Sequence, residues 1–227
     1  MWFRTRCRAF AFVGLLVVTA VIGIPVSRAT FAEKPAEHGE RGLPDLSAIR
    51  LIDKDKAVSI TLQDAFAYHG DPCPGAIVAF RGVQLAGRLL WSDAIPRRED
   101  IVILSRGSMY GLLDVFALVT RGPIECKADA ISQPSKVLGS MPISRDSFAF
   151  TIVRRSTGEA VDLRVKPTVY PDEFFLLRGK AANGEATPAE RGRLKRYKAG
   201  LIDAIPRRTE GELFEPPVRY RVLMFGA

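Results

Sequence analysis

The fold is decided by a short turn and the apolar run that follows it: Tyr68-His69-Gly70-Asp71-Pro72-Cys73-Pro74-Gly75. The turn holds one of the two histidines and one of the three cysteines in the chain. The run from 76 to 91 predicts a long core helix, because its polar residues recur at spacings of three and four. The predicted polar face comprises Arg81, Gln84 and Arg88, and the predicted buried face comprises Ile77, Ala79, Phe80, Val83, Ala86 and Leu90.

This position makes Cys73 a candidate for a reactive or metal-binding thiol. Unpaired N–H groups at a helix N-terminus favour the thiolate form of a cysteine, which attacks electrophiles and binds metals. His69 lies four residues earlier, so the two side chains can share a ligand or a proton. Imidazole and thiolate both suit zinc or iron. A structural interpretation stays open, in which Cys73 is a core residue and His69 only ends a helix.

The N-terminus has the pattern of an export signal. Residues 1–8 carry three arginines and no acid, and residues 9–26 are apolar apart from Thr19. Small residues at 27 and 29 predict cleavage after Ala29, or alternatively after Ala32. We therefore expect a signal peptide over 1–29 and a periplasmic or extracellular protein. The alternative is a membrane anchor formed by residues 9–26, since this run approaches the roughly 20 residues that span a bilayer.

Charge argues against a nucleic-acid partner. The formal net charge of +8 falls to +4 without residues 1–29, which hold four arginines and no acid. The remaining basic residues are interspersed with acidic ones and form no stripe. We expect contact with a membrane only through an uncleaved N-terminal segment.

The remaining chain divides into a linker over 30–50 and one domain over 51–227. The linker lacks periodicity, and His38 within it is expected to be solvated. In the domain, Thr61 and Asp64 predict a capping box for a short helix that stops at Gly70. A basic helix is predicted from Pro188 to Ala204. The predicted strands are 101–104, 115–120, a hairpin of 148–155 with 160–166, and 218–225.

Helices and antiparallel strands without a regular βαβ repeat predict an α+β fold, with helices packed on a mainly antiparallel sheet. Residues 106–111 are predicted as a loop, and a short helical stretch is predicted after Cys126. Cys73 and Cys126 are the cysteines that remain after the signal. Two thiols in an exported protein ordinarily predict a disulfide, which competes with a metal site.

Four blocks of this sequence resemble the FmdE-like family, which is named after a component of formylmethanofuran dehydrogenase, over about residues 59–216. Residues 69–75 with Arg81 are similar to its His-Gly-His-x-Cys-Pro-Gly…Arg signature. The further blocks, in the expected order, are Cys126 to Ile131, Phe148 to Val161 and Glu212 to Phe214.

The resemblance implies an α+β homodimer with a metal site, most simply of zinc, although the same donors suit ferrous iron. Carried over to this chain, the ligands are His69, Cys73 and Cys126. Asp129 matches the acid that follows the second cysteine, with a structural or supporting role. The family name refers to one component of a molybdenum or tungsten enzyme and does not itself imply an activity.

The chain departs from the family pattern in three places. Asp71 replaces the second histidine of the His-Gly-His triplet and offers an oxygen donor. Residues 136–142 lack the cysteine expected there, and the C-terminal zinc ribbon of some members is missing because no cysteine follows Cys126. An export signal is also unusual for this family.

Three functions remain open from the sequence. The first is a metal-binding protein with His69, Cys73 and Cys126 as ligands, and water, Asp71 or a small-molecule substrate at the fourth position. The second is a non-catalytic exported domain with a Cys73–Cys126 disulfide, acting in binding or interaction. The third is a thiol enzyme with Cys73 as nucleophile and His69 as base. The sequence thus leaves open whether the protein is an enzyme.

Overall fold

The central element of the fold is helix α2 (Pro74–Trp91), which confirms the predicted core helix. Residues 76–80 are fully buried, whereas Arg88 is exposed and Arg81 and Gln84 are half-buried, as the polar face predicts. Pro74 occupies the first helical position, where its fixed φ favours helix initiation. The chain therefore organises its core around the segment that follows the His-Cys turn.

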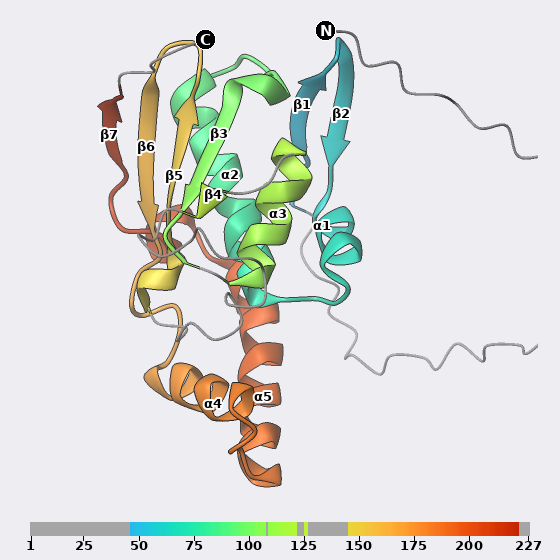
Figure 1. Cartoon of the computed structure of the whole chain (residues 1–227), viewed down its shortest axis with the longest axis vertical. Helices are drawn as coiled ribbons and strands as arrows, with labels where there is room; N and C mark the ends of the chain where they lie inside the picture. The colour runs from blue at the N-terminus through green and yellow to red at the C-terminus, as the bar shows by residue number, and fades with distance from the viewer. Residues whose placement is uncertain (1–45, 108, 122–124, 127–144, 223–227) are drawn as a thin grey trace, which may run out of the picture. The chain divides into compact units, whose positions relative to one another are not determined.

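A computed structural model describes residues 46–107, 109–121, 125–126 and 145–222 (Figure 1). They belong to one unit, Arg41–Ala227. The predicted signal over 1–29 and most of the predicted linker lie outside the described residues. Within the described ranges, no helix is long and apolar enough to cross a membrane.

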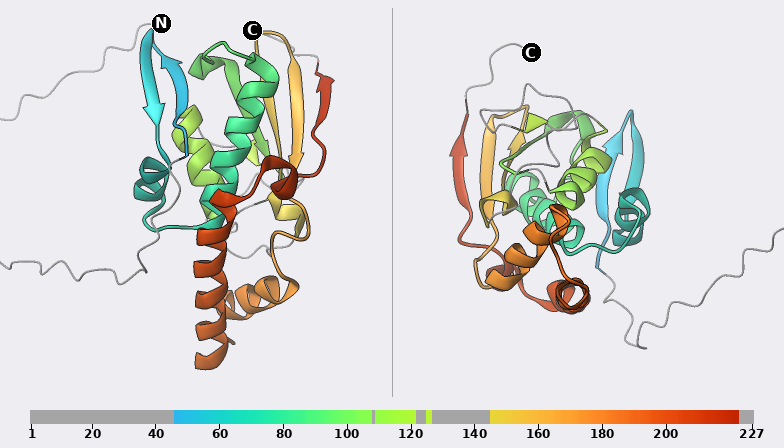
Figure 2. Two further views of the ribbon diagram at one scale, coloured as in Figure 1. Left: turned by 180° about the vertical axis from the view of Figure 1, so that it is seen from behind. Right: turned by 60° about the horizontal axis from the view of Figure 1, so that its bottom comes forward.

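Five strands form the main sheet in the order β4-β3-β5-β6-β7. Its strands are β3 (Ile101–Ser105), β4 (Glu125–Cys126), β5 (Ala149–Arg154), β6 (Glu159–Arg164) and β7 (Val218–Arg221). Neighbours pair antiparallel except β3 with β4, which are parallel. Helix α2 packs against this sheet, and α3 (Tyr110–Thr120) packs beside α2 (Figures 1 and 2). The α+β prediction is confirmed.

The predicted hairpin is confirmed in β5 and β6, which pair Ile152 with Val161. Its turn places Gly158 at φ 71°, a left-handed conformation that favours glycine. Phe150 and Leu163 face α2 at Gly82, where a methyl group would overlap the Phe150 ring. Glycine at position 82 therefore lets the helix approach the sheet closely.

A second, two-stranded sheet was not predicted. Strands β1 (Ile49–Asp53) and β2 (Lys56–Ile60) pair antiparallel, and Ile49 precedes the predicted start of the domain. Lys54 and Asp55 form the turn at φ 47° and 65°. Two successive left-handed residues match the right-handed twist of a tight hairpin.

The capping box predicted at Thr61 is present, and the basic helix predicted from Pro188 also begins with a capping box. Thr61 caps α1 (Leu62–His69) through Asp64, and Thr187 caps α5 (Pro188–Ala204) through Glu190. Gly70 ends α1 at φ 101°, as predicted. The remaining short elements are α4 (Asp172–Ala182), α6 (Glu210–Leu213), η1 (Arg98–Asp100), η3 (Arg145–Phe148) and η4 (Ile205–Arg207).

The predicted strand over 115–120 is wrong, because these residues form the C-terminal half of α3. Residues 110 and 111, predicted as loop, begin the same helix. The predicted final strand, 218–225, is present as β7, which ends at Arg221. Residues 223–225 of the predicted range lie outside the described residues. The helical stretch predicted after Cys126 and the 136–142 segment also lie outside them.

Candidate functional site

His69 is the last residue of α1, and its ring lies against α3. Its Nδ1 is 2.6 Å from Oδ2 of Asp114. The His69 side chain is 13% exposed, and that of Asp114 is 33% exposed. The left-handed Gly70 ends the helix directly after His69 and returns its N–H to the Phe66 carbonyl. A half-buried carboxylate thus fixes the orientation of the candidate ligand.

This pairing decides which nitrogen of His69 is available. A carboxylate accepts hydrogen bonds, so Nδ1 carries the hydrogen and Nε2 is left as the candidate metal-binding atom. Nε2 lies 3.5 Å from Oδ1 of Asp71, whose side chain is 68% exposed. Two electron-pair donors therefore face each other, and a cation between them or a proton on Nε2 would satisfy both.

Cys73 is the N-cap residue of α2, in extended conformation, and is half-buried. Its thiol is free, so the structure gives no support to the alternative disulfide with Cys126. A preformed nucleophile–base pair requires a hydrogen bond between the two side chains. Among the described residues, no hydrogen bond joins Cys73 to His69.

Helix α3 brings Cys73 and His69 to one region. A methyl group at Gly111 would lie 2.8 Å from Cys73 Sγ and 3.0 Å from the Ala76 nitrogen, so this glycine allows a close approach. Asp114, the partner of His69, is three residues further along α3. Positions three apart share a helix face. The two candidate ligands therefore contact adjacent turns of α3.

Tyr170 is a buried polar residue of the core. Its ring packs against Phe148 and Phe174, with centroid distances of 4.3 Å and 5.2 Å, and the residue is 3% exposed. Its hydroxyl has no hydrogen-bond partner among the described residues. Burial, then the charge of Cys73, raises the pKa of Tyr170 well above 10, whereas Arg208 acts in the opposite direction. The hydroxyl therefore keeps its proton and has an unused hydrogen-bond donor.

Cys126 and Asp129 lie at the margin of the described residues. The Cys126 backbone pairs with Ser105 at the end of β3. The chain leads from that strand end through a short connection to α3. The Cys126 side chain and all of Asp129 lie outside the described residues. The structure thus assigns Cys126 a strand end near the start of α3 and leaves its ligand role a prediction.

The described residues contain no group of three or more histidine, cysteine, aspartate or glutamate side chains arranged to hold a metal ion. A three-ligand site therefore needs the Cys126 thiol. The donors present still fit a metal chemically, because His69 has a carboxylate on Nδ1 and a free Nε2, as metal-binding histidines usually do.

Two residues of this region were missed from the sequence. Asp114 was hidden by the wrong strand assignment of its neighbours, although one acid inside an apolar run is a signal that it has a partner. Tyr170 carries no such signal, because its unpaired hydroxyl is a result of tertiary packing.

An α+β domain with a carboxylate-held histidine and an N-cap cysteine defines a class of candidate metal-binding domains. The family model described as "FmdE, Molybdenum formylmethanofuran dehydrogenase operon" matches residues 68–215. The chain belongs to the FmdE family, which confirms the resemblance drawn from the sequence. A search of curated proteins finds no match.

Proposed function

We propose that the protein binds a metal ion through His69, Cys73 and Cys126. Zinc is the proposed metal, and ferrous iron is the alternative that the same donors allow. The observation that carries this proposal is the 2.6 Å contact between His69 Nδ1 and Asp114 Oδ2. This contact leaves Nε2 beside the Asp71 carboxylate, and membership of the FmdE family supports the same interpretation.

Each residue has a distinct role in the proposed site. Asp114 holds the His69 ring in one orientation and increases its strength as a donor. Asp71 lies on the Nε2 side, as a fourth ligand or as a hydrogen-bond acceptor for a bound water. Asp129 is proposed to support the Cys126 side. Three protein ligands leave a position for water or a small-molecule substrate, where zinc would act as a Lewis acid.

Tyr170 is proposed to donate its hydrogen bond to the Cys73 thiolate. Buried polar groups are rarely left unpaired, and the Tyr170 hydroxyl has no hydrogen-bond partner among the described residues, Cys73 included. A hydrogen bond to a coordinating sulfur tunes its charge and orientation. The three phenylalanines around the ring restrict the direction of the hydroxyl.

The location and assembly of the protein are also proposals. The signal-like residues 1–29 support export to the periplasm or the extracellular space, with anchoring by 9–26 as the alternative. The resemblance to the FmdE family supports a homodimer.

The test is the metal content of mature protein purified without added metal, with a thiol count on the same sample. We expect about one equivalent of zinc or iron and two thiols per chain, as for a single three-ligand site. His69→Ala should lose the ion, and His38→Ala, which changes the other histidine, should keep it. Full occupancy in His69→Ala would exclude the proposed ligand set. No metal and no free thiol would instead establish a disulfide-linked, non-catalytic domain.

A further inference from the structure

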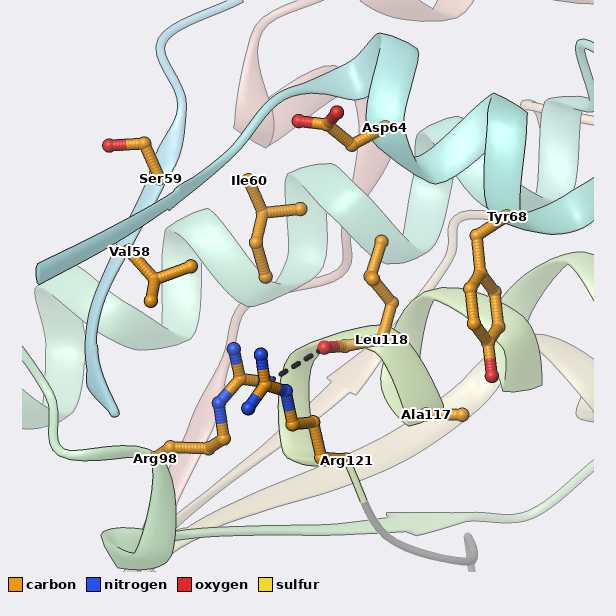
Figure 3. A pocket seen from close by; sticks show the side chains of 9 residues that line it. All are labelled: Val58, Ser59, Ile60, Asp64, Tyr68, Arg98, Ala117, Leu118 and Arg121. Carbon is orange, nitrogen blue, oxygen red and sulfur yellow. Dashed lines mark hydrogen bonds between the residues drawn. The ribbon is translucent and has the colours of Figure 1, made fainter. Parts of the chain in front are cut away.

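A pocket of about 640 Å³ opens between β2, α1 and the C-terminal half of α3 (Figure 3). Its volume falls within the range of small-molecule sites. On α3 it begins at Ala117, one turn beyond the Asp114 that holds His69. Neither His69 nor Cys73 lines it. The pocket is therefore a separate feature of the fold, close to the proposed metal site.

Two arginines approach this pocket from different elements. Arg98, from η1, has a side chain only 7% exposed, and its Nη1 donates to the Leu118 carbonyl oxygen (Figure 3). The same nitrogen also donates to the Val119 carbonyl oxygen. Arg121, the residue that ends α3, is 63% exposed. A charged side chain as buried as Arg98 ordinarily has a full set of partners.

The charges of these arginines are incompletely compensated. Both guanidinium groups form an ion pair with the same carboxylate, that of Asp53. Its Oδ2 is 3.4 Å from Arg98 Nε and 2.5 Å from Arg121 Nη1. The Arg98 Nε makes no hydrogen bond to a described residue, since its contact with Asp53 is an ion pair without suitable geometry. Burial lowers the pKa of Arg98 by more than the Asp53 charge raises it, and the charge of Arg121 lowers it further. One carboxylate thus serves two cations.

The rest of the pocket is largely apolar. Val58 and Ile60 of β2 and Leu118 of α3 provide aliphatic surface, and the exposed ring of Tyr68 stands at the far end (Figure 3). The acidic residue that lines it, Asp64, is engaged in the α1 capping box, where its Oδ2 accepts from the Thr61 nitrogen and hydroxyl. The pocket therefore combines a cationic end with an apolar wall.

We propose that this pocket binds a small organic anion, with its carboxylate or phosphate at Arg98 and Arg121 and its apolar or aromatic body against Val58, Ile60 and Leu118. Guanidinium groups bind both kinds of anion through paired N–H donors. The ion pair of Arg121 uses Nη1, and none of its other guanidinium N–H groups has a partner among the described residues, so they can donate to the ligand. This inference is independent of the proposed metal site.

The experiment is a calorimetric titration of the full-length chain with benzoate and with phenyl phosphate, and with neutral benzamide as a matched control. We expect saturable binding of at least one anion, weakening with salt, and at least 10-fold weaker binding of benzamide, as expected for charge-assisted hydrogen bonds. Arg121→Gln should weaken anion binding by at least about 10-fold. Arg155→Gln, an exposed arginine outside the pocket, should leave it unchanged.

Three results would overturn the proposal. They are no saturable binding of either anion, benzamide binding as tight as the anions, or unchanged affinity in Arg121→Gln. Because Arg121 is exposed at the end of α3, its variant should fold, and an unchanged circular dichroism spectrum would verify this.

Discussion

Asp114 and His69 are 45 residues apart in the chain, yet the Asp114 carboxylate lies 2.6 Å from the imidazole Nδ1. The contact joins the last residue of α1 to the middle of α3 and orients Nε2 toward Asp71. The proposed role of His69 as a metal ligand rests on this contact, because metal-binding histidines commonly have a carboxylate on the second nitrogen.

We expect Asp114→Asn to lower zinc affinity about 10-fold to 100-fold while keeping the fold. The asparagine amide has the same shape as the carboxylate but carries no negative charge, and only its oxygen can accept a hydrogen bond from Nδ1. Competition against a chromogenic chelator measures the change. Asp93→Asn, which alters an exposed acid outside this region, serves as the control. Equal affinities in the two variants would remove Asp114 from the proposed site.

Tyr170→Phe removes one oxygen and keeps the packed ring. If the hydroxyl is merely unpaired, its removal should stabilise the protein by about 1 kcal/mol and leave metal affinity unchanged. If it donates to Cys73, we expect weaker metal binding and a shift of the thiolate absorption in the metal-loaded protein. Tyr197→Phe, whose hydroxyl contacts Glu173 elsewhere, should show neither effect on the metal.

Gly111→Ala should destabilise the protein by about 1 to 3 kcal/mol, the usual cost of overpacking. Its methyl group would lie 2.8 Å from Cys73 Sγ and 3.0 Å from a backbone nitrogen, so α3 must move away from α2. Urea unfolding measures the change. Gly87→Ala is the matched control, because nothing lies within 4 Å of its added methyl group. There we expect stabilisation of about 0.5 to 1 kcal/mol. The steric account fails if both variants behave alike.

The folding stability of the protein should depend on pH at low pH through the ionisation of Glu190. Hydrogen bonds from the Lys180 side chain and from Thr187 lower the pKa of Glu190 from 4.5 to about 2. Because the folded-state value is the lower one, this stabilisation is present above pH 4.5 and is lost as the pH falls toward 2.

The difference in melting temperature between wild type and Glu190→Gln should therefore be largest near neutral pH and shrink below pH 4.5. The exposed Glu185→Gln provides the reference for a glutamate without a described partner. A difference that stays constant between pH 7 and pH 2 would contradict the assignment.

Local sequence signals predicted the elements that carry them. Thr61 with Asp64 marked the start of α1, and Pro188 marked the start of α5, because both signals lie within the first turn of a helix. The spacing of polar residues predicted α2, because residues three and four apart share a helix face. These features need no knowledge of the rest of the fold.

Elements that depend on tertiary context were harder to predict. Helix α3 is apolar on several sides and contains β-branched Val115, Val119 and Thr120, so its composition resembles that of a buried strand. This error also concealed Asp114, the partner of His69. The hairpin of β1 and β2 was missed because its turn, Lys54 with Asp55, lacks the glycine that usually marks left-handed positions.

The candidate site was only partly predictable. His69 and Cys73 could be predicted as candidate ligands because they lie in one short stretch of sequence. Helix α3, which contacts both through Asp114 and Gly111, was not predicted. The roles of Cys126 and Asp129 stay predictions, because neither side chain is among the described residues.

The most direct test of the metal site is the near-ultraviolet absorption of the full-length chain loaded with Co²⁺, where thiolate-to-cobalt charge transfer is observed. We predict this absorption in the wild type and, unchanged, in Cys7→Ser. Because two thiolate ligands are proposed, Cys126→Ser and Cys73→Ser should each keep about half of it. Absorption that is missing in the wild type, or unchanged in Cys73→Ser, would contradict the proposed site.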